Sequence, residues 1–222
     1  IFNLATTEKH KIFPTILSRC QIFDFKRITI KDAKDHLAEV AKSQNITFED
    51  DALQIIAQKA DGAMRDALSI FDRVVSFCGN HLTRKAVAEN LNVLDFEVYV
   101  TFTDLILENK IPDLLLHFND ILTRGFDAHQ FVIGLASHFR DLMVCKSPAT
   151  LILLEAGEEA QRLFKEQAQK SETDFLLEAI HLANTCDLKY KTSQNQRLLV
   201  ELCLMQLASI TFEQKKKVAA SL

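Results

Sequence analysis

The first 25 residues show a different pattern of hydrophobic positions from the rest of the chain. An apolar run opens it at residues 1–6, and apolar and polar residues alternate over 21–25. Both patterns are typical of strands, and the stretch 14–18 between them predicts one helical turn with proline near its start. Two short strands and one turn of helix cannot form a domain alone. We therefore expect residues 1–25 to belong to a sheet whose other strands lie outside this sequence, or else to be disordered.

A helical spacing of apolar residues begins at Thr29. Thr29 and Asp32 resemble a capping box, and the apolar stripe that follows predicts a helix to about Ser43. Further stripes predict helices over 49–60, 63–78 and 83–91. Together these helices predict a small helical domain, which we place at residues 26–92.

Longer helices with short connections follow, as expected for antiparallel neighbours in a bundle. They are predicted over 95–108, 112–124, 127–146, 150–170 with an interruption at Gly157, 173–190 and 195–212. The last is apolar on nearly all sides, so we expect it to be central in its domain or buried against another subunit. The predicted fold class is mainly α: the end of an α/β domain with two short strands (1–25), the small helical domain (26–92) and a helical bundle (93–222).

Composition excludes several kinds of site. The chain has 222 residues and only five glycines, placed so that neither a GxxxxGK[ST] nor a GxGxxG phosphate loop can be written. The five cysteines lie far apart, which argues against a zinc site or any other metal site and indicates reduced, buried thiols. No stretch approaches the roughly 20 apolar residues of a membrane span, and the net charge of −4 does not indicate nucleic-acid binding by the surface as a whole. We expect a cytoplasmic protein with no membrane contact.

Two threonines stand where the opening apolar run ends. Ligands gather at the carboxyl ends of strands in open α/β sheets, so the hydroxyl of Thr6 or Thr7 could reach a phosphate or a water. Either residue could instead cap the next turn of the chain. The residues alone leave both readings open.

Two arginines are candidates for phosphate contacts. Arg19 ends the predicted helical turn; it is either solvated or presented to phosphates on a neighbouring subunit, where a planar, permanently charged guanidinium stabilises a transferred phosphoryl group. Arg65 lies in the first turn of a predicted helix, where the helix dipole disfavours a cation. Asp61 or Asp66 could offset that cost, or Arg65 could contact a phosphate bound at the helix start. The seven histidines show no repeated nucleophile–base pattern that would indicate enzyme chemistry within the chain.

Three motifs, taken in order, resemble the clamp-loader branch of the AAA+ ATPases. They are Leu4-Ala5-Thr6-Thr7-Glu8, Pro14-Thr15-Ile16-Leu17-Ser18-Arg19-Cys20 and Gly62-Ala63-Met64-Arg65-Asp66-Ala67-Leu68-Ser69. The resemblance covers essentially the whole chain and is closest to the gamma/tau family of bacterial DNA polymerase III. Two later stretches are similar to the third domain of that family: Arg124-Gly125-Phe126-Asp127 and Ser193-Gln194-Asn195-Gln196-Arg197-Leu198. Gln196 departs from the proline more often found there, which bears on a helix start and not on chemistry.

The resemblance implies a role for each candidate residue. Thr7, together with Thr6, matches sensor 1, which senses the γ-phosphate of ATP. Arg19 matches the arginine finger that acts in trans on ATP bound by the adjacent subunit, and Arg65 matches sensor 2, which contacts ATP in its own subunit. Residues 1–25 would then end the AAA+ core, residues 26–92 would form the lid, and residues 93–222 would form the collar that holds a ring of subunits together.

The resemblance also implies parts that precede this sequence in the family: the Walker A and Walker B motifs and a zinc-binding cysteine module. ATP and Mg are therefore expected cofactors of the full-length protein, whereas this fragment is expected to bind none and to be inactive alone. The implied activity is ATP-driven loading of the sliding clamp on primed DNA for the replicative polymerase. The implied partners are the other clamp-loader subunits (delta, delta-prime and further gamma/tau copies), the clamp and the primed DNA.

Two alternatives stay open. One is a non-hydrolysing clamp-loader subunit of the delta-prime type, although the sequence around Arg65 argues against it. The other is a helical scaffold with no nucleotide role. That scaffold would tolerate loss of residues 1–25 and the substitution Arg19→Ala.

Overall fold

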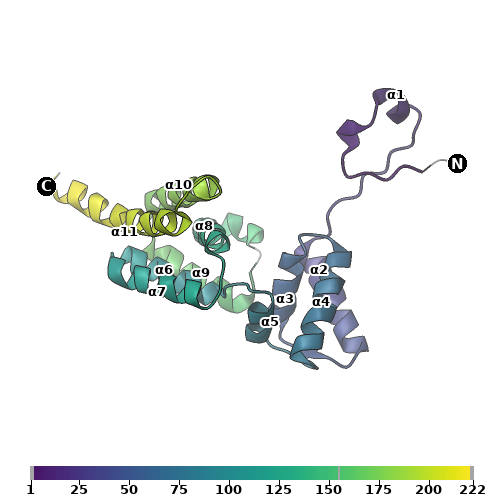
Figure 1. Ribbon diagram of the computed structural model, residues 1–222, viewed down its shortest axis with the longest axis horizontal. Helices are drawn as coiled ribbons and strands as arrows, with labels where there is room; N and C mark the ends of the chain where they lie inside the picture. Colours follow the sequence, from purple (N-terminus) through teal and green to yellow (C-terminus); the bar gives the residue numbers. More distant parts are fainter. Residues whose placement is uncertain (1–2, 155, 221–222) are drawn as a thin grey trace.

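The computed structural model describes residues 3–154 and 156–220, with the backbone alone over 211–220. Figure 1 shows three parts along the chain: an N-terminal segment that stands away from the rest, the helices α2 to α5, and the helices α6 to α11. We call the last two the α2–α5 unit and the α6–α11 unit. The described residues are predominantly helical, as the sequence predicts.

The N-terminal segment, residues 3–28, contains two short helices and no strand in its described residues. These helices are η1 (Lys9–Lys11) and α1 (Pro14–Leu17), so the single turn predicted after residue 13 is confirmed. The strands expected at 1–6 and 21–25 are not formed over 3–6 and 21–25, because neither stretch has a partner strand among the described residues. Residues 1 and 2 lie outside the described part. No described side chain of the segment is buried.

The α2–α5 unit consists of short helices and one small parallel sheet. Its elements are α2 (Ile30–Ser43), β1 (Thr47–Phe48), α3 (Asp50–Lys59), α4 (Met64–Cys78), β2 (His81–Leu82) and α5 (Arg84–Asn90). The cap predicted for α2 is confirmed, since the Thr29 hydroxyl accepts a hydrogen bond from the Asp32 N–H at 3.1 Å and donates to its carboxylate at 2.7 Å. The sequence did not predict the pairing of β1 with β2, whose strands are only two residues long. Leu37, Leu53, Ile56, Phe71, Val74 and Leu82 fill the core of the unit.

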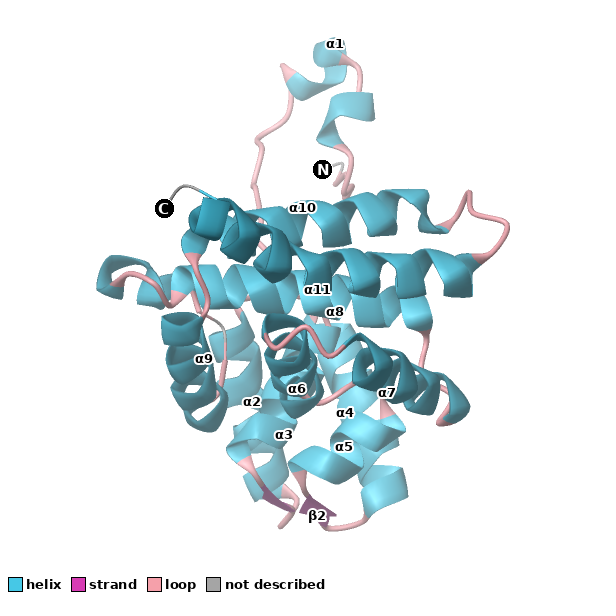
Figure 2. Cartoon of the chain, turned by 90° about the vertical axis from the view of Figure 1, so that its left-hand side faces the viewer, coloured by secondary structure: helices cyan, strands magenta, loops and turns pink. Residues whose placement is uncertain are grey.

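The α6–α11 unit is a bundle with a separate core. Its elements are α6 (Phe96–Leu107), α7 (Ile111–Thr123), α8 (Ala128–Val144), η2 (Pro148–Leu153), α9 (Glu158–Lys170), α10 (Thr173–Tyr190) and α11 (Gln196–Ala220). Helices α8 and α11 both pack against α10, and α6, α7 and α9 lie on one side of that layer (Figure 2). The helix expected over 150–170 with an interruption at Gly157 is divided into η2 and α9, and the backbone of Leu154 and of Gly157 is extended.

Phenylalanine rings fill the centre of the α6–α11 unit. The ring of Phe131 lies 4.7 Å from that of Phe102 and 5.5 Å from that of Phe118, measured between centroids. Helix α11 packs against α6, α7, α8 and α10, so its apolar residues are largely used within the chain, while Leu198 and Leu202 stay about half exposed. Over the residues that the structure describes, none of the helices has the length and apolar character needed to cross a membrane.

Candidate functional site

The two threonines at the first candidate site are exposed. The Thr6 hydroxyl oxygen accepts a hydrogen bond from the backbone N–H of Glu8 at 3.0 Å, which is a local turn contact. Thr7 lies in the bend that follows, with its side chain in solvent. The structure thus gives Thr6 the capping contact that the sequence left open and leaves the Thr7 hydroxyl accessible.

Arg19 lies just after α1, and its side chain is exposed. The backbone of Arg19 continues the turn, with its N–H donating to the carbonyl of Ile16 at 3.0 Å. The guanidinium forms no ion pair or hydrogen bond with any other described residue. A cation that makes no side-chain contact with the described residues is available to an anion supplied from outside.

Arg65 occupies the first turn of α4, and its guanidinium is exposed without an ion pair among the described residues. Asp61, which could have offset its charge, is used elsewhere: its backbone carbonyl accepts a hydrogen bond from Arg27 at 2.8 Å, and its carboxylate pairs with the same guanidinium. A cation therefore stands at a helix N-terminus with no compensation from Asp61. Free backbone N–H groups and an arginine at such a terminus fit a phosphate.

The turn before α4 also holds the end of the N-terminal segment. The N–H of Ile28 donates to the carbonyl of Gly62 at 3.1 Å. Gly62 has a φ of +80°, and a Cβ at this position would lie 2.8 Å from the Cβ of Arg27. The close approach requires glycine, so the chain that carries Thr7 and Arg19 joins the molecule a few residues before Arg65.

Thr7, Arg19 and Arg65 do not converge on one site. Thr7 and Arg19 lie on the N-terminal segment, which projects away from α4 (Figure 1). Within the described residues there is also no cluster of three histidine, cysteine or acidic side chains that could hold a metal ion.

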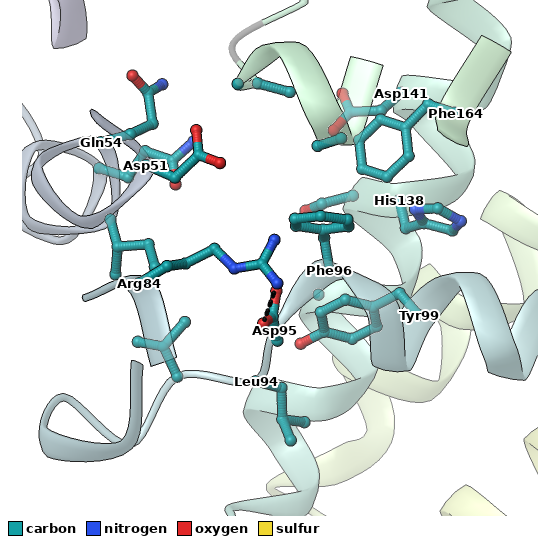
Figure 3. Close-up of a pocket in the computed structure, with 18 residues that line it drawn as sticks. Asp51, Gln54, Arg84, Leu94, Asp95, Phe96, Tyr99, His138, Asp141 and Phe164 are labelled. Carbon is teal, nitrogen blue, oxygen red and sulfur yellow. Dashed lines mark ion pairs between the residues drawn. The ribbon is translucent and has the colours of Figure 1, made fainter. Parts of the chain in front are cut away.

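A cavity of about 240 Å³ lies where the α2–α5 unit meets the α6–α11 unit (Figure 3). Asp51 and Arg84 line it from the first unit, and Tyr99, His138 and Phe164 line it from the second. Burial raises the pKa of the Tyr99 phenol, and burial also raises the pKa of the Asp51 carboxyl. No pattern in the sequence indicates this cavity, because its two walls come from helices far apart along the chain.

His138, in the wall of the cavity, is part of a buried chain of hydrogen bonds. Its Nε2 lies 2.7 Å from Oε1 of Gln167, whose amide nitrogen donates to the Val100 carbonyl and to Asp104, both at 2.8 Å. Because Gln167 uses its N–H groups on those oxygens, its own oxygen must accept, and the imidazole therefore carries its proton on Nε2. Burial lowers the pKa of His138 from 6.5 to about 4, with the Gln167 hydrogen bond opposing the shift. This histidine is a neutral structural residue.

Comparison with known proteins identifies relatives of this chain. Residues 32–80 match the ATPase lid domain of the DNA polymerase III clamp loader subunit. DNA polymerase III subunit tau of Bacillus subtilis is 30% identical over 214 residues, which are 96% of this chain and 38% of that protein. The chain is similar to the tau and gamma subunits of DNA polymerase III over nearly its whole length. The resemblance inferred from the three motifs is thereby confirmed.

Other clamp-loader proteins are similar over smaller parts or at lower identity. The gamma/tau subunit of Mycoplasma genitalium is 34% identical over 133 residues, 60% of this chain and 22% of that protein. The Bacillus subtilis DNA clamp loader delta protein is 19% identical, with a TM-score of 0.48 over 92% of this chain and 64% of that one. The chain spans less than two fifths of the length of its Bacillus subtilis tau relative. Helix α4 and Arg65 fall inside the residues that match the lid domain.

Proposed function

We propose that this chain is the part of a clamp-loader ATPase subunit that reads the state of bound ATP and passes it to neighbouring subunits. The observation that carries the proposal is the exposed Arg65 at the N-terminus of α4, inside the matched lid domain and with Asp61 engaged by Arg27. An arginine held this way costs stability unless an anion joins it, and local costs of this kind concentrate at functional positions.

Each candidate residue has a role in this proposal. Arg65 acts as sensor 2 on ATP of its own subunit, and Arg19, which makes no side-chain contact within the described chain, acts as the arginine finger on ATP of the adjacent subunit. Thr7, with Thr6 beside it, acts as sensor 1. ATP with Mg supplies the phosphoryl group whose transfer releases energy, and the residues proposed here bind and orient its phosphates.

The proposed organisation follows the two hydrophobic cores. Residues 26–92 would be the lid, residues 93–222 the collar, and residues 1–25 the end of the ATPase core; the first hydrophobic core runs to Leu91 and the second begins at Leu94. The proposed partners are further clamp-loader subunits, the sliding clamp and primed DNA. The proposed activity of the whole protein is ATP-driven loading of that clamp for the replicative polymerase.

The test uses the whole natural protein in a ring reconstituted with its partner subunits, clamp and primed DNA. DNA-stimulated ATP hydrolysis is measured for Arg19→Ala, for Arg65→Ala and for Arg73→Ala, an exposed arginine further along α4 that serves as the matched control. Loss of an arginine finger typically lowers turnover by roughly a thousandfold or more. We expect a loss on that scale for Arg19→Ala, weaker ATP binding by Arg65→Ala in its own subunit, and wild-type behaviour for Arg73→Ala.

The alternatives give different results in the same experiment. Full activity of both the Arg19→Ala and the Arg65→Ala ring would overturn the assigned roles. A wild-type protein that assembles but never hydrolyses ATP in any position of the ring would indicate a subunit of the delta-prime type. Unchanged assembly and activity after removal of residues 1–25 would favour a helical scaffold.

A further inference from the structure

The two helical units meet through side chains at one edge of the cavity. The extensive helix–helix packing recorded for the described residues lies within one unit or the other, and the cavity separates α3 and α5 from the first turns of α6 and α9. Relative motion of such units is the default expectation unless specific contacts oppose it. The contacts at this edge therefore decide how the two units are oriented.

Arg84 provides those contacts. Its guanidinium lies 2.9 Å from a Glu97 carboxylate oxygen, 3.2 Å from Asp95 and 3.5 Å from Glu159. It also stands over the ring of Phe96, 4.6 Å from the centroid, in a cation–π contact (Figure 3 shows the pair with Asp95). Arg84 comes from α5, whereas its four partners all belong to the α6–α11 unit. We call these five residues the Arg84 clasp.

The base of the Arg84 side chain is fixed as well. Its backbone N–H donates to a Glu49 carboxylate oxygen at 2.7 Å, and Thr83 before it caps α5 through the N–H of Ala86 at 3.3 Å. The side chain is only 17% exposed. A held backbone and a planar fork with several donors leave the guanidinium few alternative positions.

Helix dipoles favour the same arrangement. Asp95 is the N-cap of α6, Glu97 lies in the first turn of α6, and Glu159 lies in the first turn of α9. Acidic residues are stabilised at helix N-termini. The first turns of α6 and α9, two helices of the α6–α11 unit, therefore both present carboxylates to the Arg84 guanidinium. Beside it, a side chain at Gly157 would overlap the Asp51 carboxylate, which shows how closely α3 approaches the start of α9.

We propose that Arg84 is the positioning residue that sets the orientation of the α2–α5 unit on the α6–α11 unit. Because Arg65 lies on α4 of the first unit, Arg84 also sets the direction from which Arg65 approaches its ligand. The orientation itself does not depend on the proposed function. Only the effect of that orientation on how Arg65 meets ATP rests on the proposed function. The proposal about Arg84 and the proposed function can therefore be refuted separately.

The test measures the distance between the units in the 222-residue chain. Spectroscopic labels are carried by unnatural amino acids at Lys42 in α2 and Lys191 after α10, both exposed, so that the five native cysteines stay unlabelled. Double electron–electron resonance should give a narrow distance distribution for the wild type. Arg84→Ala should broaden the distribution and shift its mean, and Arg84→Lys, which keeps the charge but loses the fork, should restore the mean in part.

The control is Arg197→Ala, because Arg197 pairs with Glu201 inside α11 at 2.8 Å and crosses no junction. Its distribution should equal that of the wild type. An unchanged distribution in Arg84→Ala, with helix content intact by circular dichroism, would overturn the proposal. Should Arg84→Ala lose helix content, Glu97→Gln combined with Glu159→Gln removes two of the partners and keeps Arg84; a wild-type distribution in that variant would likewise reject the clasp.

Discussion

Two arginine–carboxylate contacts join the three parts of this molecule, and they differ in their surroundings. Arg27 and Asp61 tie the N-terminal segment to the turn before α4, with side chains that are 73% and 81% exposed. Arg84 ties the α2–α5 unit to the α6–α11 unit, with a side chain that is 17% exposed and an aromatic ring beneath it. Water screens the first contact and is largely displaced from the second.

The exposed contact and the buried contact join different kinds of region: a segment without a hydrophobic core among its described residues in the first case, and two units that each have one in the second. The segment behind the exposed contact carries Thr7 and Arg19, buries none of its described side chains and has one backbone hydrogen bond, from Ile28 to Gly62, at its junction. The parts joined by Arg84 each have a core of their own. Thr7 and Arg19, the two residues proposed to contact ATP phosphates from this segment, thus lie on the part of the molecule with the fewest contacts to the rest of the described chain.

The largest expected effect is on the free energy of unfolding, when a phenylalanine in the core of the α6–α11 unit is truncated and compared with one in the N-terminal segment. Phe131 is fully buried among aromatic rings, and Phe131→Ala should lower the free energy of unfolding by about 4 kcal/mol, since a cavity is left behind. Phe25 is 95% exposed, and Phe25→Ala should change it by less than about 0.5 kcal/mol. Urea denaturation of the 222-residue chain measures both. A loss at Phe25 as large as that at Phe131 would show that the segment has a packed environment of its own.

A smaller effect concerns pH. Because burial lowers the pKa of His138 to about 4, the folded chain resists a proton that the unfolded chain takes up near pH 6.5. The unfolded state therefore binds more protons between these values, and stability falls as the pH drops from about 6.5 to 4. We expect a loss of about 2 kcal/mol between pH 7 and pH 5, measured by urea denaturation at each pH.

The control for this pH effect is a second histidine of the same unit. His181 is exposed on α10, so His181→Gln should keep the pH dependence, whereas His138→Gln should remove most of it while lowering stability at pH 7. An identical pH dependence in both variants would place the responsible group outside the chain of hydrogen bonds that joins His138 to Gln167.

Local signals in the sequence predicted the helices well and the junctions poorly. The cap at Thr29 and the apolar stripe after it depend on residues within one helix, and the structure confirms them. The strand patterns at 1–6 and 21–25 are also local, but a strand forms only with a partner, and the described chain offers them none. Arg84 gave no signal, because Glu97 and Glu159 lie 13 and 75 positions away and nothing local marks their approach.

The smallest expected effect concerns the junction between the N-terminal segment and the turn before α4. Gly62 and Gly79 both have positive φ, +80° and +74°, so alanine at either position should cost about 1 kcal/mol of backbone strain. Gly79 has nothing within 4 Å of an added Cβ, whereas at Gly62 the Cβ would meet Arg27 and the carbonyl of Ile28.

Gly62→Ala should therefore also displace the N-terminal segment. Limited trypsin digestion detects this displacement as faster cleavage after Lys26 and Arg27. Gly79→Ala should leave that cleavage rate unchanged. Equal rates in the two variants would mean that the close contact between Gly62 and Arg27 does not hold the segment, and that this junction rests on the Arg27–Asp61 contact and the Ile28 hydrogen bond.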